Sequence, residues 1–576
     1  MKMKVPEIPI DMVAWRKLPH FARLHPLVVH FAENGSKTPW FIYLFYVVKM
    51  SAFAAGGLAI LVATPGFALA EIDTWWHEPV VYQKILAYTA LWEALGIGAS
   101  SGPLAFKMAI PFVAPLHWAR VGTIRQPPWP RVVPLTGGDR RTLVDVVLWL
   151  GVIGLLVSLL FVGGAGTAAD PMSGVAPAGL IIALFVTTIV LGLRDKVAFL
   201  ASRPDIFAFA LVFLVFPYEQ AMIGLQVTLA FVWVGAGISK LTHHFSPVVA
   251  VMNSNAPGRP KAFKRALYRD FPEDLRPSLL THLLAHAGTV VEVVVPLVLL
   301  VSGPGPVSAV GVALLIVLHV AILCHIPLAV PNEWNVFMMA AALWLFWTHA
   351  DASLSDLTPG VVAYLLVMWV APVVVGSLRP DLVSFQLAMR YYAGNWAASA
   401  WCFRGDAASR LSPNITKAAP MVHEQFEELY SPEYAEITGM ILRGWRALHP
   451  QGRAINGLLL RGLDDLDSYQ VIDGEIIGCA INGWNLGDGH LHNEGLLASV
   501  QKRCNYAPGE LVVVMIEAQP IHRGDIGYRI VDAALGQLEA GRIKVADFVD
   551  RQPWTADPLP VQLETPAYAP RELATP

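Results

Sequence analysis

The sequence predicts an α-helical multi-pass membrane bundle of about 8–10 spans, followed by a smaller α+β soluble domain. Three observations lead to this fold class. First, 55% of the 576 residues are hydrophobic and only 15% are charged, whereas soluble domains carry about 25% charged residues. Second, apolar runs follow one another from residue 40 to residue 377. Third, from about residue 420 the sequence shows the mixed helix and strand periodicities of a soluble domain.

The predicted membrane domain contains ten apolar runs. Because a full helical span needs about 20 residues, the runs over 205–218 and 334–349 are short, and we expect them to be tilted, broken or re-entrant. The runs lie near residues 40–64, 84–101, 142–163, 177–193, 205–218, 220–239, 281–302, 306–330, 334–349 and 359–377.

The loops between these runs alternate in charge. Lys and Arg gather in one set of loops and are absent from the other set, which is 65–83, 164–176, 303–305 and 350–358. The positive-inside rule therefore puts the basic loops, the N-terminus and the C-terminal domain in the cytoplasm. The formal net charge of −3 gives no indication of a nucleic-acid partner, and the four widely spaced cysteines form neither a zinc nor a disulfide framework.

We divide the chain into five parts by composition. They are an amphipathic cytoplasmic segment (1–39), the membrane domain (40–377), an interfacial amphipathic linker (378–419), the soluble α+β domain (420–555) and a Pro-rich tail (556–576). The aromatic stretch Arg390–Arg404 is typical of a segment lying in the membrane interface, and a helix packed under the membrane domain is an equal alternative. Further on, "YQVIDGEIIGCAING" and "GELVVVMIEAQPIH" indicate strands, and "YRIVDAALGQLEAGRI" indicates a helix.

Ionisable side chains inside the apolar runs are candidates for function, because the membrane interior disfavours them. Lys240 ends the run that contains Gln226, and the next run contains His282, His286 and Glu292. His282 and His286 share one helix face, whereas Glu292 lies on a different part of that helix. Lys240 has two possible roles: it extends to the headgroups as an anchor, or it is buried and neutral and accepts a proton.

The order of these segments resembles the membrane domain of the vitamin K-dependent γ-carboxylase family, also called the horizontally transferred transmembrane domain. The resemblance rests on "FVWVGAGISKL", "LLAHAGTVVEVVVPLVLL" and "LHVAILCHIPLAVPNEWNVFMMAAALWLF". The matching positions are Gly237, Lys240, His286, Gly288, Glu292, His319 and Phe337. The whole chain also resembles a family of uncharacterised bacterial multi-pass proteins, which implies the bacterial cytoplasmic (inner) membrane.

The resemblance to the carboxylase implies a chemistry. In that family a lysine at the position of Lys240 deprotonates a reduced naphthoquinone, and oxygen addition then produces the strong base needed for glutamate carboxylation. The implied cofactor is menaquinol or another naphthoquinone. The candidate catalytic residues are Lys240, His286 and Glu292, and the candidate cofactor-binding residues are Gln226, His282 and His319. The chain departs from the family at Ser239, where the carboxylase has a second lysine, and in the C-terminal region, which is lumenal in the carboxylase.

A second cluster of polar side chains lies in "NGWNLGDGHLHNEG", residues 482–495. His490, His492 and Glu494 alternate, so that on a strand they share one face, and His522 is a candidate fourth ligand. Nitrogen and oxygen ligands of this kind suit zinc or another divalent metal. The alternative is a polar, glycine-rich turn whose side chains are solvated.

Two functions of different classes remain open. The first is a quinol-linked membrane carboxylase or oxygenase that uses Lys240 as its base. The second is a non-catalytic scaffold that binds lipid or quinone in the bundle and recruits a protein partner, or a second copy of the chain, through residues 378–576. A secondary transporter is a weaker alternative, because the sequence contains no inverted repeat.

Overall fold

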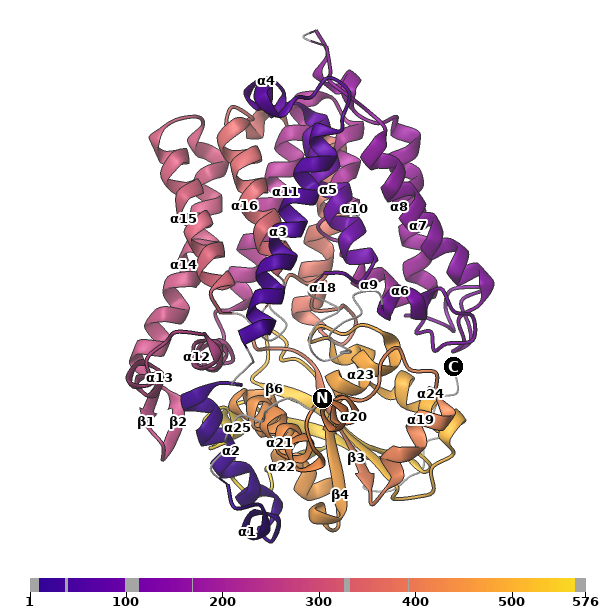
Figure 1. Cartoon of the computed structure of the whole chain (residues 1–576), viewed down its shortest axis with the longest axis vertical. Coiled ribbons are helices and arrows are strands. Elements are labelled where there is room, and N and C mark those ends of the chain that lie inside the picture. Colours follow the sequence, from indigo (N-terminus) through magenta and orange to yellow (C-terminus); the bar gives the residue numbers. More distant parts are fainter. Residues whose placement is uncertain are drawn as a thin grey trace.

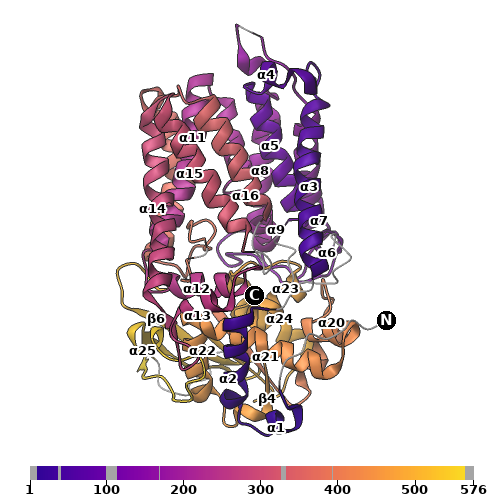
Figure 2. The ribbon, with the colours of Figure 1, turned by 60° about the vertical axis from the view of Figure 1, so that its left-hand side comes forward.

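The computed structural model describes residues 10–36, 40–98, 113–167, 169–325, 332–391 and 393–564. The long helices form one bundle, and an α+β part lies against one end of that bundle (Figure 1). Figure 2 shows the same two layers from another side, with the N-terminal helix α2 (His20–Asn34) in the α+β layer. The predicted membrane bundle followed by an α+β part is therefore confirmed in outline.

Six helices of the described chain are long and apolar enough to cross a membrane. They are Tyr43–Val62 within α3 (Trp40–Val62), Leu143–Phe161 (α7), Tyr218–Ser239 (α11), Leu279–Ser302 (α14), Pro306–Leu323 (α15) and Pro359–Leu378, which comprises α17 (Pro359–Leu365), a π-helical turn (Leu366–Val370) and α18 (Ala371–Leu378). The apolar helix α8 (Ala178–Arg194) is shorter. By this length criterion the described residues contain fewer spans than the predicted 8–10.

Two of the remaining predicted runs lie inside the bundle rather than along its surface. α5 (Pro79–Ala94) is packed among the other helices, and its polar residues Gln83 and Lys84 donate hydrogen bonds to backbone carbonyls at the end of α7. The run over 205–218 is broken, as the sequence predicts, into the short buried helix α10 (Ala208–Leu211) and a following 3₁₀ turn.

The α+β part is built on an antiparallel sheet of six strands in the order β4-β3-β5-β6-β7-β8. The strands are β3 (Ala398–Arg404), β4 (Tyr469–Asp473), β5 (Leu511–Ile516), β6 (Asp525–Asp532), β7 (Gly536–Lys544) and β8 (Gln562–Leu563). Trp401 and Phe403 pack on one face of the sheet, and Ala400 and Cys402 pack on the other. This period of two is expected for a strand whose two faces are both covered. The covering helices are α22 (Pro450–Gly462) on one face and α23 (Gly474–Asn482) with α24 (Glu494–Cys504) on the other.

The aromatic stretch at 390–404 differs from its prediction. Residues 398–404 form the buried strand β3, paired with β4 and β5, and not an amphipathic segment in the membrane interface. The sheet therefore begins before residue 420 and includes part of the predicted linker. Trp401 of this stretch packs in the core between the sheet and its covering helices.

The predicted helix over "YRIVDAALGQLEAGRI" is also wrong, because this stretch forms the hairpin β6–β7. The Asp532 carboxylate accepts hydrogen bonds from the backbone N–H groups of Ala534 and Leu535, and Gly536 has a φ of +86°. Both features are typical of a tight turn. Part of the predicted Pro-rich tail, residues 565–576, lies outside the described residues.

The N-terminal segment packs on the α+β part. α2 buries Leu24, Val28 and Phe31 against α21 (Pro432–Leu448). The two helices approach closely at Gly444, where a Cβ atom would lie 3.1 Å from a methyl carbon of Val28. The two ends of the chain sequence therefore contribute to one structural layer at one end of the bundle.

Candidate functional site

The strongest candidate site inside the membrane bundle is an ion pair between α11 and α14. Lys240 directly follows α11, and its Nζ lies 2.6 Å from Oε2 of Glu292 and also contacts Oε1. Only 7% of Lys240 and 6% of Glu292 is exposed. The helices can approach because position 237 is glycine: a Cβ atom there would lie 2.6 Å from Cγ2 of Val293. The two apolar runs that carry the predicted cluster are thus joined by a buried charge pair.

His319 of α15 lies close to this pair. Its Nε2 accepts a hydrogen bond of 2.9 Å from Nε1 of Trp233, which lies two turns before Lys240 on α11. Its Nδ1 lies 2.8 Å from Oδ1 of Asn335. Since the indole can only donate and the amide oxygen can only accept, the imidazole carries its proton on Nδ1. His319 therefore links three helices as a neutral, fully bonded ring.

Asn335 belongs to a buried polar start of α16 (Asn332–Leu343), the helix that continues into a π-helical turn over Trp344–Thr348. Its neighbour Glu333 forms an ion pair of 2.7 Å with Lys49 of α3 and accepts a hydrogen bond of 3.3 Å from Trp92 of α5. The predicted run over 334–349 is therefore irregular, as expected, and its first turn is a polar junction between helices.

Trp334 extends this junction to the segment that follows α8. The guanidinium of Arg203 stacks 3.5 Å above the Trp334 ring, a cation–π contact in the interior of the protein. Arg203 is also held by Asp205 at 3.0 Å and by the hydroxyl of Tyr391 at 2.8 Å. Polar side chains therefore connect α3, α5, α15, α16 and the residues around 203 at the end of the bundle that meets the α+β part.

The structure does not bring every predicted residue to the Lys240 pair. Gln226 lies 14 positions earlier on α11, which is about 21 Å along a helix. There it donates hydrogen bonds to the carbonyls of Leu345 and His349. His282 instead lies 2.8 Å from the hydroxyl of Ser246, and His286 is exposed on α14. Of the six predicted residues in the bundle, Lys240 and Glu292 are in contact, and His319 is bonded to the same helix two turns before Lys240, through Trp233.

The three predicted metal ligands do not converge. His490 lies in a 3₁₀ turn and Glu494 begins α24, so they do not share a strand face. The Nε2 of His490 lies 3.1 Å from Glu517, the Nδ1 of His492 lies 2.6 Å from the hydroxyl of Ser399, and Glu494 pairs with Arg529. His522 is exposed. Over the described ranges, no three or more His, Cys, Asp or Glu side chains are arranged to hold a metal ion.

The surroundings of His490 and His492 shift the pKa values of the two histidines in opposite directions. Burial disfavours the charge on both His490 and Glu517, but their mutual hydrogen bond and charge attraction, together with the charges of Asp488 and Arg529, outweigh burial, raising the pKa of His490 and lowering the pKa of Glu517 to about 2. Burial lowers the pKa of His492 to about 4. The two shifts favour an ion pair between His490 and Glu517, whereas His492 is a neutral structural residue at neutral pH.

A cavity of about 310 Å³ lies where the bundle meets the α+β part. One wall is apolar and comes from the membrane helices, with Phe231 and Ile238 of α11 and Val373 of α18. The lining on the side of the α+β part includes the polar residues Asn395 and Gln519, which exchange two hydrogen bonds of 2.9 and 2.7 Å, besides Pro520 and Ile521. Apolar side chains of the membrane helices together with polar groups on this side suit an amphipathic ligand.

Arg390 is the charged residue of the lining on the side of the α+β part. It is 5% exposed, and its Nε and Nη1 have no hydrogen-bond partner in the part of the chain that the structure describes. Burial lowers the pKa of Arg390 to about 10, so it is still a cation at neutral pH. The carboxylates that act on it are engaged elsewhere: Asp488 accepts from the hydroxyl of Ser384, and Glu517 binds His490. The cavity is therefore lined by a buried cation with unused donors.

A protein family matches nearly the whole chain. The family described as "Transmembrane protein of unknown function (DUF3556)" matches residues 1–564. The chain belongs to this family. DUF3556 membership agrees with the several membrane-spanning helices of the bundle. No curated protein and no solved structure matches the chain, so the resemblance to the γ-carboxylase stays a prediction.

Three residues of this DUF3556 chain that shape the site were missed by sequence reasoning: Glu333, Asn335 and Arg390. For the first two a signal exists, because "NEWN" (332–335) places polar and aromatic side chains consecutively at the start of an apolar run. Such residues inside a membrane domain indicate a buried junction. For Arg390 the sequence offers no comparable signal, since an arginine beside two tyrosines is equally typical of an exposed interfacial anchor.

Proposed function

We propose that the chain binds a membrane lipid with an anionic headgroup in the cavity between α11, α18 and the loops that carry Arg390 and Gln519. The observation that carries the proposal is Arg390, a buried cation whose Nε and Nη1 have no partner among the described residues. A buried guanidinium is costly when the nearby carboxylates, here Asp488 and Glu517, are bonded to other groups and not to it. A phosphate oxygen is a ligand that its forked donors fit well.

The two walls of the cavity suit the two ends of a lipid. Ile238 and Leu241 are exposed apolar side chains at the end of α11, where acyl chains of the bilayer can lie against them. Arg390 and Asn395 line the cavity on the side of the α+β part, where we place the headgroup. A quinone headgroup carries no negative charge, so among the two ligands that the sequence leaves open the lipid fits Arg390 better.

This proposal gives Lys240 a structural role. A general base needs a free lone pair, and an ammonium that donates to a carboxylate has none. To act on a quinol, Lys240 would first have to leave Glu292, which it contacts through both carboxylate oxygens. The geometry therefore favours the lipid-binding hypothesis over the quinol-linked carboxylase.

The proposal includes a location. The α+β part packs against the ends of the bundle where the basic loops lie, and the positive-inside rule assigns these loops to the cytoplasm. We therefore assign the α+β part to the cytoplasmic side of a bacterial inner membrane, and the lipid to the cytoplasmic leaflet. Anionic lipids are concentrated on cytoplasmic faces, which agrees with a cationic headgroup site.

The test is lipid binding by the full-length protein in detergent, measured by native mass spectrometry during titration with phosphatidylglycerol or phosphatidylcholine. We expect the wild type to prefer phosphatidylglycerol by about ten-fold, the effect of one charge-assisted hydrogen bond. Arg390→Gln removes this preference. The matched control is Arg379→Gln, which changes an exposed arginine in the same loop whose guanidinium pairs with Asp381 at 2.7 Å.

A second variant covers the case in which Arg390→Gln does not fold. Ile238→Trp enlarges an exposed side chain on the apolar wall and leaves Arg390 unchanged, so it is expected to weaken binding of the lipid without changing the fold. Equal affinity of the wild type for the two lipids, or an unchanged preference in folded Arg390→Gln, would refute the proposal.

A further inference from the structure

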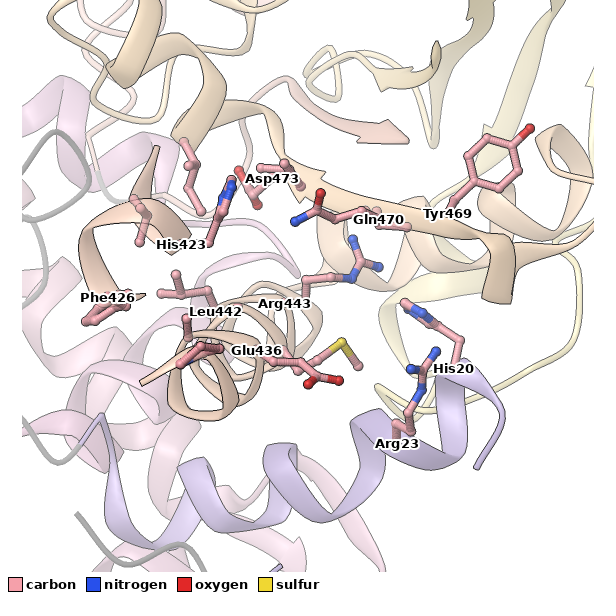
Figure 3. A pocket seen from close by; sticks show the side chains of 18 of the residues that line it. His20, Arg23, His423, Phe426, Glu436, Leu442, Arg443, Tyr469, Gln470 and Asp473 are labelled. Atoms are coloured by element: carbon pink, nitrogen blue, oxygen red, sulfur yellow. The ribbon is translucent and has the colours of Figure 1, made fainter. Parts of the chain in front are cut away.

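A second and larger cavity lies in the α+β part, away from the membrane helices. Its volume is about 550 Å³, within the range of sites for small organic ligands, about 300–1,000 Å³. It is bounded by the N-terminal helices α1 (Met12–Arg16) and α2, by α20 (Val422–Leu429) and α21, and by strand β4 (Figure 3). The cavity is therefore formed jointly by the first residues of the chain and the C-terminal domain.

Three basic side chains line one side of this cavity. In Figure 3 the imidazole of His20 and the guanidinium groups of Arg23 and Arg443 lie near one another between α2, α21 and β4. His20 is 5% exposed and Arg443 is 8% exposed. The Nε2 of His20 and the Nε atoms of Arg23 and Arg443 have no hydrogen-bond partner within the described residues. Two buried basic groups and a third beside them thus have unused nitrogens at one cavity.

Of the three basic groups, Arg23 has a carboxylate partner, whereas Arg443 and His20 have none among the described residues. Asp467 binds the Nη2 of Arg23 at 2.6 Å, so it holds one end of that guanidinium and leaves its Nε unpaired. Glu436 binds Arg16 at 2.8 Å, and Asp473 binds Arg446 at 2.6 Å. Among the residues that the structure describes, Arg443 donates only to a neutral amide, Oδ1 of Asn456, at 2.9 Å.

The wall also includes the apolar and aromatic side chains of Trp15, Val422, Phe426 and Leu442, besides polar residues that include the carboxylates Glu427, Glu436, Asp467 and Asp473. A buried guanidinium beside such a wall is costly unless a negative group meets it. Buried polar atoms in native proteins are nearly always bonded, and an unpaired one calls for a specific explanation such as a bound ion. A carboxylate or phosphate that accepts from Arg443 and Arg23 supplies that explanation.

We propose that this cavity binds a soluble small molecule that carries a phosphate or carboxylate group attached to an apolar or aromatic body. The anionic group contacts Arg443, Arg23 and His20, and the body lies against Trp15 and Phe426. This site shares no residue with the lipid cavity around Arg390, so each proposal stands or fails by itself. The DUF3556 chain then has a ligand site in its water-facing part in addition to one at the membrane.

The probes are phenyl phosphate and benzoate, with benzyl alcohol as the neutral analogue, titrated into the full-length protein in detergent by calorimetry. We expect at least one anion to bind at least ten-fold more tightly than benzyl alcohol, from one charge-assisted contact. Preference for phenyl phosphate identifies a phosphate site, and preference for benzoate identifies a carboxylate site.

Two variants locate the binding. Arg443→Gln is expected to weaken binding of the preferred anion at least ten-fold, whereas Arg404→Gln, which changes an exposed arginine of β3 paired with Asp464, leaves it unchanged. Because Arg443 is buried, Gly439→Leu provides a second variant. Gly439 lines the cavity on α21, and a Cβ atom there meets no atom within 4 Å, so a larger side chain begins in open space and is expected to occupy part of the cavity.

Binding of the anion that is lost in both Arg443→Gln and Gly439→Leu supports the proposal. If Arg443→Gln fails to fold, loss in Gly439→Leu with folded protein is sufficient. No binding of either anion by the wild type, equal binding of benzyl alcohol, or unchanged binding in Gly439→Leu overturns it.

Discussion

Lys240 and Glu292 meet where α11 crosses α14, with 2.6 Å between Nζ and Oε2, at a point where Gly237 places no side chain between the helices. Both charges are buried, so each is stabilised mainly by the other. Lys240 is therefore held inside the protein by a partner on another helix, and the pair adds a polar contact to the extensive packing between α11 and α14.

Removing one member of this pair is expected to destabilise the protein more than removing both. Glu292→Gln leaves the Lys240 ammonium buried without a counter-charge, which costs about 3–5 kcal/mol in comparable cases. The double variant Lys240→Met, Glu292→Leu removes both charges and is expected to recover most of the loss. Thermal unfolding in detergent, followed by size-exclusion chromatography, measures both. A single variant that melts with the wild type would show that the pair contributes little.

The close approach of α11 and α14 predicts opposite effects for two glycines. Gly237→Ala puts a Cβ atom 2.6 Å from Val293, and such overpacking costs about 1–3 kcal/mol. At Gly288 of α14 a Cβ atom meets nothing within 4 Å, so Gly288→Ala is expected to be neutral or stabilising by up to about 1 kcal/mol. The same melting measurement compares them. A larger loss at Gly288 than at Gly237 contradicts the geometry described for the crossing.

The cluster at Lys240 was predictable only in part. The membrane's aversion to charge identifies Lys240 and Glu292 as special, and the structure joins them. The cost of burying charge does not show which face of each helix meets its neighbour. In the structure His286, six residues before Glu292, lies on the exposed side of α14. At about 100° per residue, a side chain six residues further along a helix is rotated by roughly 240° beyond one full turn. His286 and Glu292 therefore point to different sides of α14. Which side chains come into contact depends on how the helices pack, and this cannot be derived from a single sequence.

The errors in the α+β part have local causes. In "YRIVDAALGQ" the helix-forming Ala534 and Leu535 lie in the turn of a hairpin, and the strand signal lies in the alternation of Tyr528, Ile530 and Asp532. Here tertiary pairing with β5 overrides local propensity. The long apolar runs of the bundle were predicted more securely, because their burial in lipid depends on composition alone.

The stability of the α+β part is expected to fall as the pH is lowered from 6.5 toward 4. Burial lowers the pKa of His492 to about 4, whereas an unfolded histidine has a pKa of about 6.5. Between these values the unfolded state binds more protons, so acid favours unfolding, by at most about 3 kcal/mol for this residue. His449 and His244, with pKa values lowered by burial to about 3 and about 4, act in the same direction.

The measurement is the melting temperature of wild type and His492→Asn at pH 7, 6 and 5. His492→Asn is expected to lose less stability on acidification than the wild type, and His522→Asn, at an exposed position, is expected to follow the wild type. The neighbouring pair of His490 and Glu517 affects stability at other pH values. Glu517, with its pKa lowered to about 2, stabilises the folded state above pH 4.5, and this effect is lost only as the pH falls toward 2. The raised pKa of His490 adds stability below pH 6.5 that is lost as the pH rises through its folded value. Parallel pH profiles for wild type and His492→Asn contradict the prediction.

The sidedness of the α+β part can be decided by cysteine labelling. Positive-inside charge puts this part in the cytoplasm, whereas the carboxylase resemblance puts it on the opposite side. Ser355 is exposed in the loop before α17, at the far end of the bundle, and Ser412 is exposed in the α+β part. In a Cys324→Ser background, which removes the exposed native thiol, Ser355→Cys should react with a membrane-impermeant maleimide on intact cells and Ser412→Cys only after lysis. The reverse labelling pattern would show that the α+β part lies outside the cytoplasm. It would place the lipid cavity in the outer leaflet and contradict the assignment of the lipid to the cytoplasmic leaflet.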